Sequence, residues 1–472
     1  MNTPLETSWS RQDTHWAPLN TWNQLAPRSY NRFLLCFEIP NERHAAAISH
    51  LESCAVKLGG TRPVLNSLLK VNTPTAHIKI IGQPKIPVQV YDINKTFGKT
   101  YTQLKEAGFP ASAFIAPIFE VPRGDVTHAL ILRIYTIDGG LLLGIHLHHA
   151  LGDGKAVDDV ISWLSAVSRK EMYDGRSAIL PSPFNENDHP SDLIDDEKLL
   201  NSEYIRQLFP ERTLLTSPFS QNEESIGNIF VFKIATLNTI RSQMCQSENA
   251  GQPSISVILI ALLWAHVVKA RMDTGKLSNT REYLRLFTLV DVRKRVFSTD
   301  EADRYFGNAV EAALTTLTTA DLLKVCGRTT VDTDFGILAK LVEPICRSVQ
   351  ASIREVDANF VRKRYTVFSR LQDPRRLVFD YFPNDAGCFM LNSWRYVGLN
   401  AEQKWSFPGV SGVEYPDAIR RASGEWNLPA AVILPARPDS GEVEVMVTTE
   451  ACAMAMLLKD EGLMRLVTRV LG

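Results

Sequence analysis

The sequence predicts a mixed α/β fold in which sheets and helices form layers. The chain has 472 residues, enough for two or three domains with substantial cores. Apolar runs with strand character, such as "RFLLCFEI" and "ALILRIYTI", are mixed with segments whose apolar residues recur at helical spacing. Because the two kinds of segment do not alternate strictly, they favour two mixed α/β layers over a doubly wound parallel sheet.

The first part of the chain begins with the predicted strand "RFLLCFEI" and a helix over residues 42–57. A strand near "HIKIIG" follows. The clearest local signal is a hairpin in which "DGG" joins "ALILRIYTI" to "LLLGIHLHH". The next segment predicts a helix, because apolar residues recur there at helical spacing: Val157, Val160, Ile161, Trp163, Leu164 and Val167.

The middle of the chain predicts a linker, because "PSPFNENDHPSDLIDDEKLL" is rich in proline and acidic residues. We therefore expect an N-terminal domain over residues 1–185, a crossover linker over 186–227 and a C-terminal domain over 228–472. Beyond the linker, "SISVILIALLWAHVVKAR" predicts a largely buried helix, and a terminal helix is expected to close the chain. The predicted strands are "NIFVFKI", "LRLFTLVDVR", "RLVFDYF" and "EVEVMVTT".

Composition limits the partners and the location. With 51 basic and 52 acidic residues, the net charge of -1 argues against nucleic acid or an anionic membrane as the main partner. The start, "MNTPLETSWSRQDTHW", has no apolar signal core, and the longest apolar stretch, residues 257–265, is too short to span a bilayer. Seven scattered cysteines indicate reduced thiols. We expect a monomeric cytoplasmic protein.

The stretch "HLHHALGDG" at residues 146–154 holds three of the ten histidines of the chain. His146 and His148 have the H-x-H spacing of some zinc sites. On a strand, however, they share one face while His149 takes the other, and no second ligand cluster is apparent. We therefore predict no metal. The plain alternative is that the histidines cap a strand and satisfy local hydrogen bonds.

His149 ends an apolar strand, and "ALGDG" predicts a turn whose glycines permit tight or left-handed backbone. Asp153 then lies at a helix start, where a carboxylate can cap free amides. A neutral imidazole in this position can accept a proton near neutral pH. The chain has no G-x-S-x-G elbow, P-loop or dinucleotide fingerprint. A base without its own nucleophile suggests that a substrate supplies the nucleophile.

These residues resemble the HHxxxDG motif of the BAHD acyl-CoA-dependent acyltransferases, relatives of chloramphenicol acetyltransferase. The surrounding segments resemble family elements in the same order: "TRPVL", the hairpin "TIDGGLLLGIHLHH", "SISVILIALLWAHVVKAR", "VDVRKRV", "YFGNAV" and "NSW". "GGLLLG", "VDVR" and "YFGNAV" together resemble the fungal secondary-metabolite branch, which includes trichothecene O-acetyltransferases. The resemblance implies two chloramphenicol acetyltransferase-like domains with a central substrate channel between them.

The resemblance also implies roles for single residues. His149 matches the general base that deprotonates an acceptor hydroxyl, and Asp153 is the second residue of the catalytic motif. Asp153 is expected to pair with Arg293 of "VDVRKRV", for which a surface charge is the alternative. Gly154 and Arg293 are expected to support the site structurally.

Three further residues match positions that contact the CoA arm: Ser254, Ser393 and Trp394. A helix cap or a hydroxyl beside the core is an equally good interpretation of the two serines. The resemblance implies acyl-CoA, with acetyl-CoA favoured, as a co-substrate rather than a permanently bound cofactor. The implied partner is a small-molecule alcohol.

One motif departs from the family. The expected D-F-G-W-G is best matched by Trp405-Ser406-Phe407-Pro408-Gly409, with Ser406 in the place of the aspartate, and Glu402 is a candidate for a displaced carboxylate. The leading hypothesis is an acyl-CoA:alcohol O-acyltransferase. An N-acyltransferase remains a close variant, and the lost aspartate leaves open a relative that does not acylate.

Overall fold

The structure is a computed structural model that describes residues 17–71, 77–81, 85–121, 124–171, 184, 198–215, 224–244, 251–326, 335–381, 385–400, 402–426, 429–437 and 439–472. The start of the chain, two parts of the predicted linker (186–197 and 216–223) and Cys245 lie outside these ranges. Each of the six described cysteines is free.

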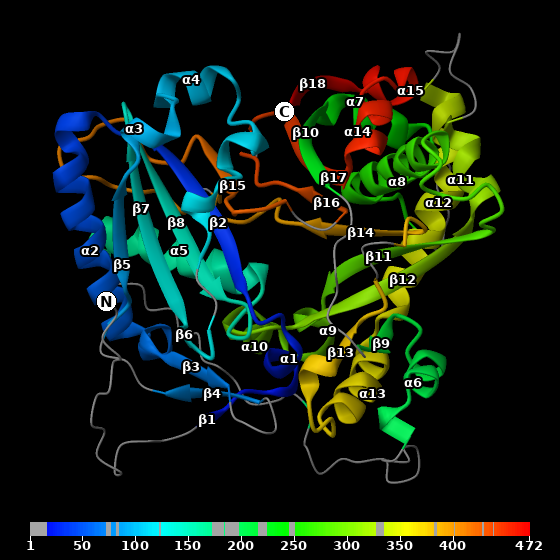
Figure 1. Cartoon of the computed structure of the whole chain (residues 1–472), viewed down its shortest axis with the longest axis horizontal. Coiled ribbons are helices and arrows are strands. Elements are labelled where there is room, and N and C mark those ends of the chain that lie inside the picture. The colour runs from blue at the N-terminus through cyan, green and yellow to red at the C-terminus, as the bar shows by residue number, and fades with distance from the viewer. Residues whose placement is uncertain are drawn as a thin grey trace.

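The N-terminal half is built on a five-stranded sheet with a buried hairpin at its centre (Figure 1). Its spatial order is β15 (Ala418–Arg421), β2 (Tyr30–Glu38), β8 (Gly140–His148), β7 (Leu130–Ile137) and β5 (Val88–Asp92). β7 and β8 form the predicted hairpin, and Gly139 in their turn has a φ of 77°, which favours glycine. Every residue of both strands is buried, so the hairpin anchors the site that follows β8.

Helices cover one face of this sheet, and short segments cover the other. α2 (His44–Thr61), preceded by η1 (Asn41–Arg43), and α5 (Gly154–Ser168) bury an apolar cluster that includes Phe33, Leu147 and Trp163. The opposite face is covered by α3 (Asn94–Phe97), α4 (Tyr101–Glu106), η3 (Ala111–Phe114) and η4 (Pro117–Phe119). A smaller sheet has the order β1 (Ala17–Pro18), β4 (Ile78–Ile81), β3 (Leu68–Val71) and β6 (Val126–His128). Two further short elements are α1 (Thr21–Leu25) and η2 (Pro63–Asn66).

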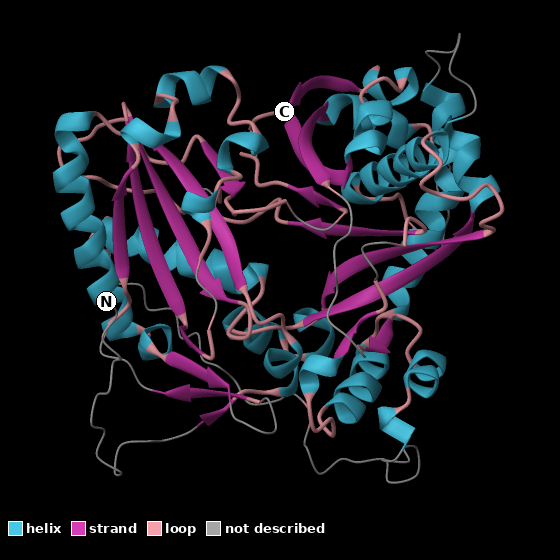
Figure 2. Ribbon diagram, in the orientation of Figure 1, coloured by secondary structure: helices cyan, strands magenta, loops and turns pink. Residues whose placement is uncertain are grey.

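The C-terminal half is built on a seven-stranded mixed sheet. Its spatial order is β12 (Val310–Thr318), β11 (Tyr283–Asp291), β14 (Cys388–Ser393), β16 (Ala430–Ile433), β17 (Glu442–Glu450), β10 (Ser225–Lys233) and β18 (Val467–Leu471). Helices gather beside this sheet, as Figure 2 shows: α7 (Ile234–Ser242), α8 (Ile255–Asp273), α11 (Thr319–Cys326), α12 (Phe335–Glu355), α14 (Ala451–Leu457) and α15 (Glu461–Met464). α9 (Arg293–Val296) and α10 (Thr299–Arg304) connect β11 to β12.

α8 is the central helix of this half, as its sequence predicts. Its length and hydropathy would suffice to cross a membrane, yet 78% of its most apolar 18-residue window is buried inside the protein. Its buried residues include Trp264 and lie on every side of the helix. A helix that is apolar all round and packed against other elements is a core helix.

A crossover segment joins the two halves. η5 (Lys198–Leu200) and α6 (Ser202–Leu208) lead to β9 (Arg212–Leu214), which pairs with β13 (Leu377–Phe379) beside α13 (Ala358–Phe368) and η6 (Pro374–Arg376). Arg212 forms a buried ion pair with Glu311 at 3.1 Å, which ties this segment to β12. The domain boundaries stay a prediction.

The chain crosses between the halves a second time. After β14, the residues from Trp394 onward pack on the N-terminal half, where Leu399, Trp405 and Phe407 join the apolar cluster of α2 and α5. β15 then pairs antiparallel with β2, and the chain returns to the C-terminal sheet at β16. The N-terminal sheet is therefore completed by residues from late in the chain.

Two sequence predictions were wrong in detail. The chain does not close with a helix: α15 is followed by β18, which pairs with β10 across more than 230 residues of sequence. "RLVFDYF" forms only the three-residue strand β13. In both cases a short apolar run takes its structure from a distant partner strand, which a local pattern does not reveal.

Candidate active site

The turn between β8 and α5 is fixed by hydrogen bonds to its backbone. The His149 N–H donates to Ser29 O at 2.8 Å, which carries the pairing of β2 with β8 one step past His148. The Ala150 N–H donates to Nδ1 of His148 at 3.2 Å, and Asn31 Nδ2 donates to Gly152 O at 2.7 Å. These hydrogen bonds hold the backbone of the turn in place between β8 and α5.

The glycines of this turn serve a different purpose from the one predicted. Neither Gly152 nor Gly154 has a positive φ. A Cβ on Gly152 would lie 2.3 Å from the Cβ of Ala156, so glycine is needed there for space. A Cβ on Gly154 would lie 3.7 Å from Cδ1 of Trp394, an ordinary contact, so Gly154 marks where Trp394 approaches the start of α5.

Asp153 caps α5 and is 4% exposed. Its Oδ1 accepts from the Lys155 and Ala156 N–H groups at 3.1 and 3.2 Å, and its Oδ2 accepts from the Ala309 N–H at 3.0 Å. Burial acts to raise the pKa of Asp153, but the charge of Arg293 and these hydrogen bonds bring the pKa below its usual value. Asp153 is therefore a fixed anion whose contacts are all to the scaffold.

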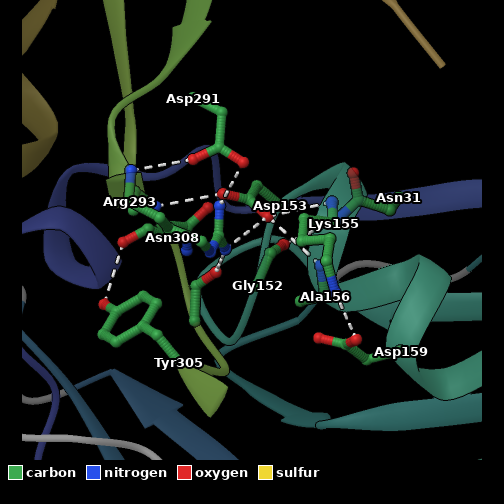
Figure 3. A network of polar contacts seen from close by, with 12 residues as sticks. Asn31, Gly152, Asp153, Lys155, Ala156, Asp159, Asp291, Arg293, Tyr305 and Asn308 are labelled. Atoms are coloured by element: carbon green, nitrogen blue, oxygen red, sulfur yellow. Dashed lines mark hydrogen bonds and ion pairs between the residues drawn. The ribbon is translucent and has the colours of Figure 1, made fainter. Parts of the chain in front are cut away.

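Arg293 completes this network from the C-terminal half (Figure 3). Its Nη2 donates to Asp153 Oδ1 at 2.9 Å and to Gly307 O at 2.7 Å, and its Nη1 lies 3.1 Å from Asp291 Oδ2. Arg293 is 3% exposed, and its guanidinium lies over the ring of Tyr305 at 5.3 Å. The predicted contact between Asp153 and Arg293 is thus present and buried, and it joins the two halves.

His149 is half-buried and is not hydrogen-bonded to Asp153. Its carbonyl oxygen accepts from Asn308 Nδ2 at 2.7 Å, and its Nδ1 is buried without a hydrogen-bond partner among the described residues. Burial lowers the pKa of the His149 imidazole; its own backbone, the charge of Asp153 and the Asn308 side chain act in the opposite direction without overcoming burial. The ring is therefore neutral at pH 7 and able to accept a proton.

His146 and His148 lie within β8 and are 1% and 3% exposed. Tyr30 lies opposite His148 in the register and packs against it edge to face, with ring centroids 5.2 Å apart. Burial lowers the pKa of each imidazole to about 3, with neighbouring cations adding to the effect. No group of three or more His, Cys, Asp or Glu able to hold a metal lies within the part of the chain that the structure describes.

Two of the residues expected to contact CoA are exposed serines at the ends of elements of the C-terminal half. Ser254 is exposed and caps α8, where its Oγ accepts from the Val257 N–H at 3.3 Å. At the other end of α8, Arg271 donates to the carbonyl of Cys388 at the start of β14. Ser393 is exposed and is the last residue of β14.

Trp394 connects the end of β14 to the motif turn. Its ring lies against Phe33 of β2, with centroids 4.5 Å apart, and near Gly154. The backbone N–H of Trp394 donates to Ile433 O at 2.8 Å, which holds this residue to β16. The structure thus brings Trp394 and the start of α5 together.

The segment that departs from the family motif, residues 405–409, lies at the C-terminal end of α5. The Ser406 N–H donates to Ser168 Oγ at 3.1 Å, and Trp405 packs in the core against Phe37 with ring centroids 5.3 Å apart. The side chains of Ser406 and Glu402 are exposed. Because α5 spans 15 residues at about 1.5 Å each, Ser406 lies about 22 Å along the helix from Asp153.

Sequence reasoning missed Asn308 and its partner Asn23 in α1. Asn308 is 5% exposed, and its Nδ2 donates both to His149 O and to Asn23 Oδ1. The one signal in the sequence was its place in "YFGNAV", which by itself assigns no contact. In the same stretch Gly307 has a φ of 152°, and a Cβ there would lie 2.9 Å from the Tyr305 hydroxyl, so glycine is required.

Comparisons with known proteins show the family of this chain. A model of the Transferase family matches residues 124–464, and a model of the trichothecene 3-O-acetyltransferase-like N-terminal domain matches residues 29–167. Trichothecene 8-O-acetyltransferase of Fusarium sporotrichioides is 19% identical over 397 residues, which cover 77% of this chain and 78% of that protein.

Solved structures share the fold. F. graminearum TRI101 in complex with coenzyme A and T-2 mycotoxin matches with a TM-score of 0.74 at 17% identity, over 97% of this chain and 100% of that one. Vinorine synthase matches with a TM-score of 0.60 at 16% identity, over 98% and 95% of the two chains. The two-domain mixed α/β fold predicted from the sequence is confirmed.

Proposed function

The chain belongs to the Transferase family, the BAHD acyltransferases, and from this membership we propose that it moves an acyl group from acyl-CoA to a hydroxyl of a small secondary metabolite. The proposed donor is acetyl-CoA. The relatives named for trichothecene O-acetylation support this choice of donor and acceptor class. The acceptor itself, a monomeric state and a cytoplasmic location remain predictions.

The observation that carries the proposal is the environment of His149. Asp153 is fully engaged by Arg293, Ala309 and the amides of α5, so it does not compete for the imidazole. Burial keeps His149 neutral, as a general base requires. His149 lies at the end of a rigid strand, where its backbone is held from both halves.

In the proposed reaction the acceptor O–H bond breaks as its proton passes to His149, and the oxygen bonds to the thioester carbonyl carbon. The C–S bond then breaks, and the departing thiolate takes the proton from His149. The products are an ester and free CoA. Because the thioester is already activated, one positioned base suffices, and such assistance contributes roughly 10²–10⁴-fold. An amine acceptor would use the same base.

We further propose that acyl-CoA approaches over Ser254, Ser393 and Trp394 of the C-terminal half. Two features support this: Ser393 is exposed, and Trp394 lies beside the first residue of α5. The acceptor would enter the channel between the halves from the opposite side. Acyl-CoA is then a co-substrate, and we propose no permanently bound cofactor.

The altered motif gives no support to a relative that does not acylate. Ser406 is exposed at the far end of α5, while the buried ion pair between Asp153 and Arg293 is present at the other end. We therefore expect the serine to leave the base unaffected.

The test is release of CoA thiol from acetyl-CoA by the purified protein, with water, small alcohols or T-2 mycotoxin as acceptor. The expected result is acceptor-dependent thiol release with formation of an acetyl ester seen by mass spectrometry. A folded wild-type protein that releases no thiol with any acyl-CoA and an extract of the producing organism would contradict the proposal.

A further inference from the structure

Asn308 connects three segments of the chain through one buried side chain. Its Nδ2 donates to His149 O at 2.7 Å and to Asn23 Oδ1 at 2.8 Å, and its backbone N–H donates to the same Asn23 oxygen at 2.9 Å. Its own carbonyl accepts from the Tyr305 hydroxyl at 2.9 Å. Both hydrogens of the side-chain amide are therefore bonded. The backbone of Asn308 is held as well, through its N–H by Asn23 and through its carbonyl by Tyr305.

The three segments come from different parts of the fold. His149 lies in the turn between β8 and α5, Asn23 lies in α1, and Asn308 precedes β12 in the C-terminal half. The N–H of His149 is held within the N-terminal half by Ser29 O. Its carbonyl is held by Asn308, so this one bond ties the backbone of His149 to the other half.

We propose that Asn308 is a positioning residue that fixes the base His149 relative to the half of the protein that binds acyl-CoA. The inference rests on the proposed function. If Ser254 and Ser393 hold the donor, the thioester is placed by the C-terminal half and the base by the N-terminal half. The hydrogen bond from Asn308 to the His149 carbonyl crosses the boundary between the two halves at the residue that acts as the base.

The chemistry of an amide explains why asparagine occupies this position. Two oxygens, His149 O and Asn23 Oδ1, face the same group, and only a donor with two N–H bonds satisfies both. An aspartate would place oxygen against oxygen, and an alanine would leave the buried carbonyl of His149 unpaired. Within the part of the chain that the structure describes, the Asn23 side chain acts through its oxygen alone, because its Nδ2 has no hydrogen-bond partner there.

The chain offers a matched control. Asn31 Nδ2 also donates to a carbonyl of this turn at 2.7 Å, that of Gly152, but it does so from β2 within the N-terminal half. Asn31→Ala and Asn308→Ala each remove one amide-to-carbonyl bond from the same turn. Only Asn308→Ala removes a bond between the backbone of His149 and the C-terminal half, and it also removes the bond from Asn308 to Asn23.

The experiment measures thiol release from acetyl-CoA with T-2 mycotoxin as acceptor. Since a displacement of about 1 Å costs about 10²-fold in rate, we expect Asn308→Ala and Asn308→Asp to lower kcat by about 10–100-fold. The KM for acetyl-CoA should change little. Asn31→Ala should lower the melting temperature comparably while keeping most of kcat, and Asn23→Ala, which leaves the bond to His149, should fall between them.

Equal kcat losses in Asn31→Ala and Asn308→Ala, or wild-type kcat in a folded Asn308→Ala, would overturn the inference. If His149→Ala loses activity while Asn308→Ala does not, the inference fails and the proposed function stands. A folded wild-type protein that releases no thiol with any acyl-CoA and an extract of the producing organism contradicts the proposed function instead. The inference is then read from the ring NMR signals of His149, which Asn308→Ala should shift or broaden and Asn31→Ala should not. Unchanged signals in Asn308→Ala would contradict it.

Discussion

The N-terminal and C-terminal ends of α5 are held by different kinds of contact. At the N-terminal end, the buried carboxylate of Asp153 accepts from the helix amides, from Ala309 and from the buried guanidinium of Arg293. At the C-terminal end, the hydrogen bonds among the described residues carry no buried charge pair: Ser168 Oγ accepts from the backbone of the exposed Ser406, Ser168 O lies 3.1 Å from His50 Nε2, and Arg169 donates to Lys404 O. Only the first end joins the two halves and lies beside His149.

The two ends of α5 therefore constrain the sequence to different degrees. A buried charge pair specifies both partners, because removing either leaves the other charge uncompensated. A backbone N–H that donates to a serine imposes no such demand on the side chain of its own residue. The motif at the first end is therefore intact, while the motif at the second end has lost its aspartate without affecting the surroundings of His149.

The largest expected effect is at the first end of α5. Asp153→Ala strands the Arg293 guanidinium, so the free energy of unfolding should fall by roughly 3–5 kcal/mol. Asp153→Asn should be milder, because the amide keeps part of the hydrogen bonding. Urea denaturation of Asp153→Ala, Arg293→Ala and the double mutant should show strongly non-additive losses. Small additive losses would mean that the pair does not couple the halves.

The next effect is a loss of folding stability at acid pH. The pKa values of His146 and His148 are lowered to about 3 in the folded protein, against about 6.5 in an unfolded chain. Between these values the unfolded chain binds protons that the folded protein does not, so stability falls as pH falls. Each histidine contributes about 1.4 kcal/mol per pH unit.

His146→Leu isolates one of these contributions. Denaturation at pH 7, 6 and 5 should show that wild type loses about 2 kcal/mol more than this variant between pH 7 and pH 5, because the unfolded histidine takes up its proton mostly below pH 6.5. His149 adds a loss of the same sign, and the loss from Asp153, whose folded pKa is also lowered, begins only below its unfolded value of about 3.9. An unchanged slope in His146→Leu would show that His146 is not held neutral.

A smaller effect is expected at the second end of α5. Ser168→Ala removes the acceptor of the Ser406 N–H and should cost about 1 kcal/mol. kcat should stay at the wild-type value, because the contacts of the first end are untouched. Thermal melts and thiol release measured on the same preparation check both statements. If Ser168→Ala lost activity without losing stability, the C-terminal end of α5 would take part in catalysis, and the comparison of the two ends would be contradicted.

No effect at all is expected from metal removal. His146 and His148 are buried in β8, and no group of three or more metal-ligating side chains lies among the described residues, so protein purified without a histidine tag should contain no stoichiometric zinc. Chelation should leave activity unchanged. Near-equimolar zinc that resists chelation would contradict this.

The parts of the fold that the sequence predicted are those with strong local signals. The Asp138-Gly139 turn specified the hairpin, and the unbroken apolar run of α8 specified a buried helix. β18 and β15 were missed because each is short and takes its structure from a strand far away in sequence. The second crossing, which carries Trp405 to the N-terminal core, has no local signal either.

The candidate site divides in the same way. The spacing of His149 and Asp153 and the charge of Arg293 are visible in the sequence, and their contact was predicted through the family motif. Asn308 was not, because its function depends on three segments meeting in space. The glycine at 152 was expected to serve backbone conformation, whereas its cause is the close approach of Ala156.

The central claim is that catalysis resides at the His149 end of α5, and it is tested most directly by comparing His149→Ala with Ser406→Ala. Both variants are assayed beside wild type for thiol release from acetyl-CoA, after circular dichroism has shown that each is folded. His149→Ala should lower kcat by roughly 10²–10⁴-fold with KM for acetyl-CoA nearly unchanged. Ser406→Ala should stay within about twofold of wild type. A folded His149→Ala protein with near-wild-type thiol release, or an equal loss in Ser406→Ala, would contradict the account.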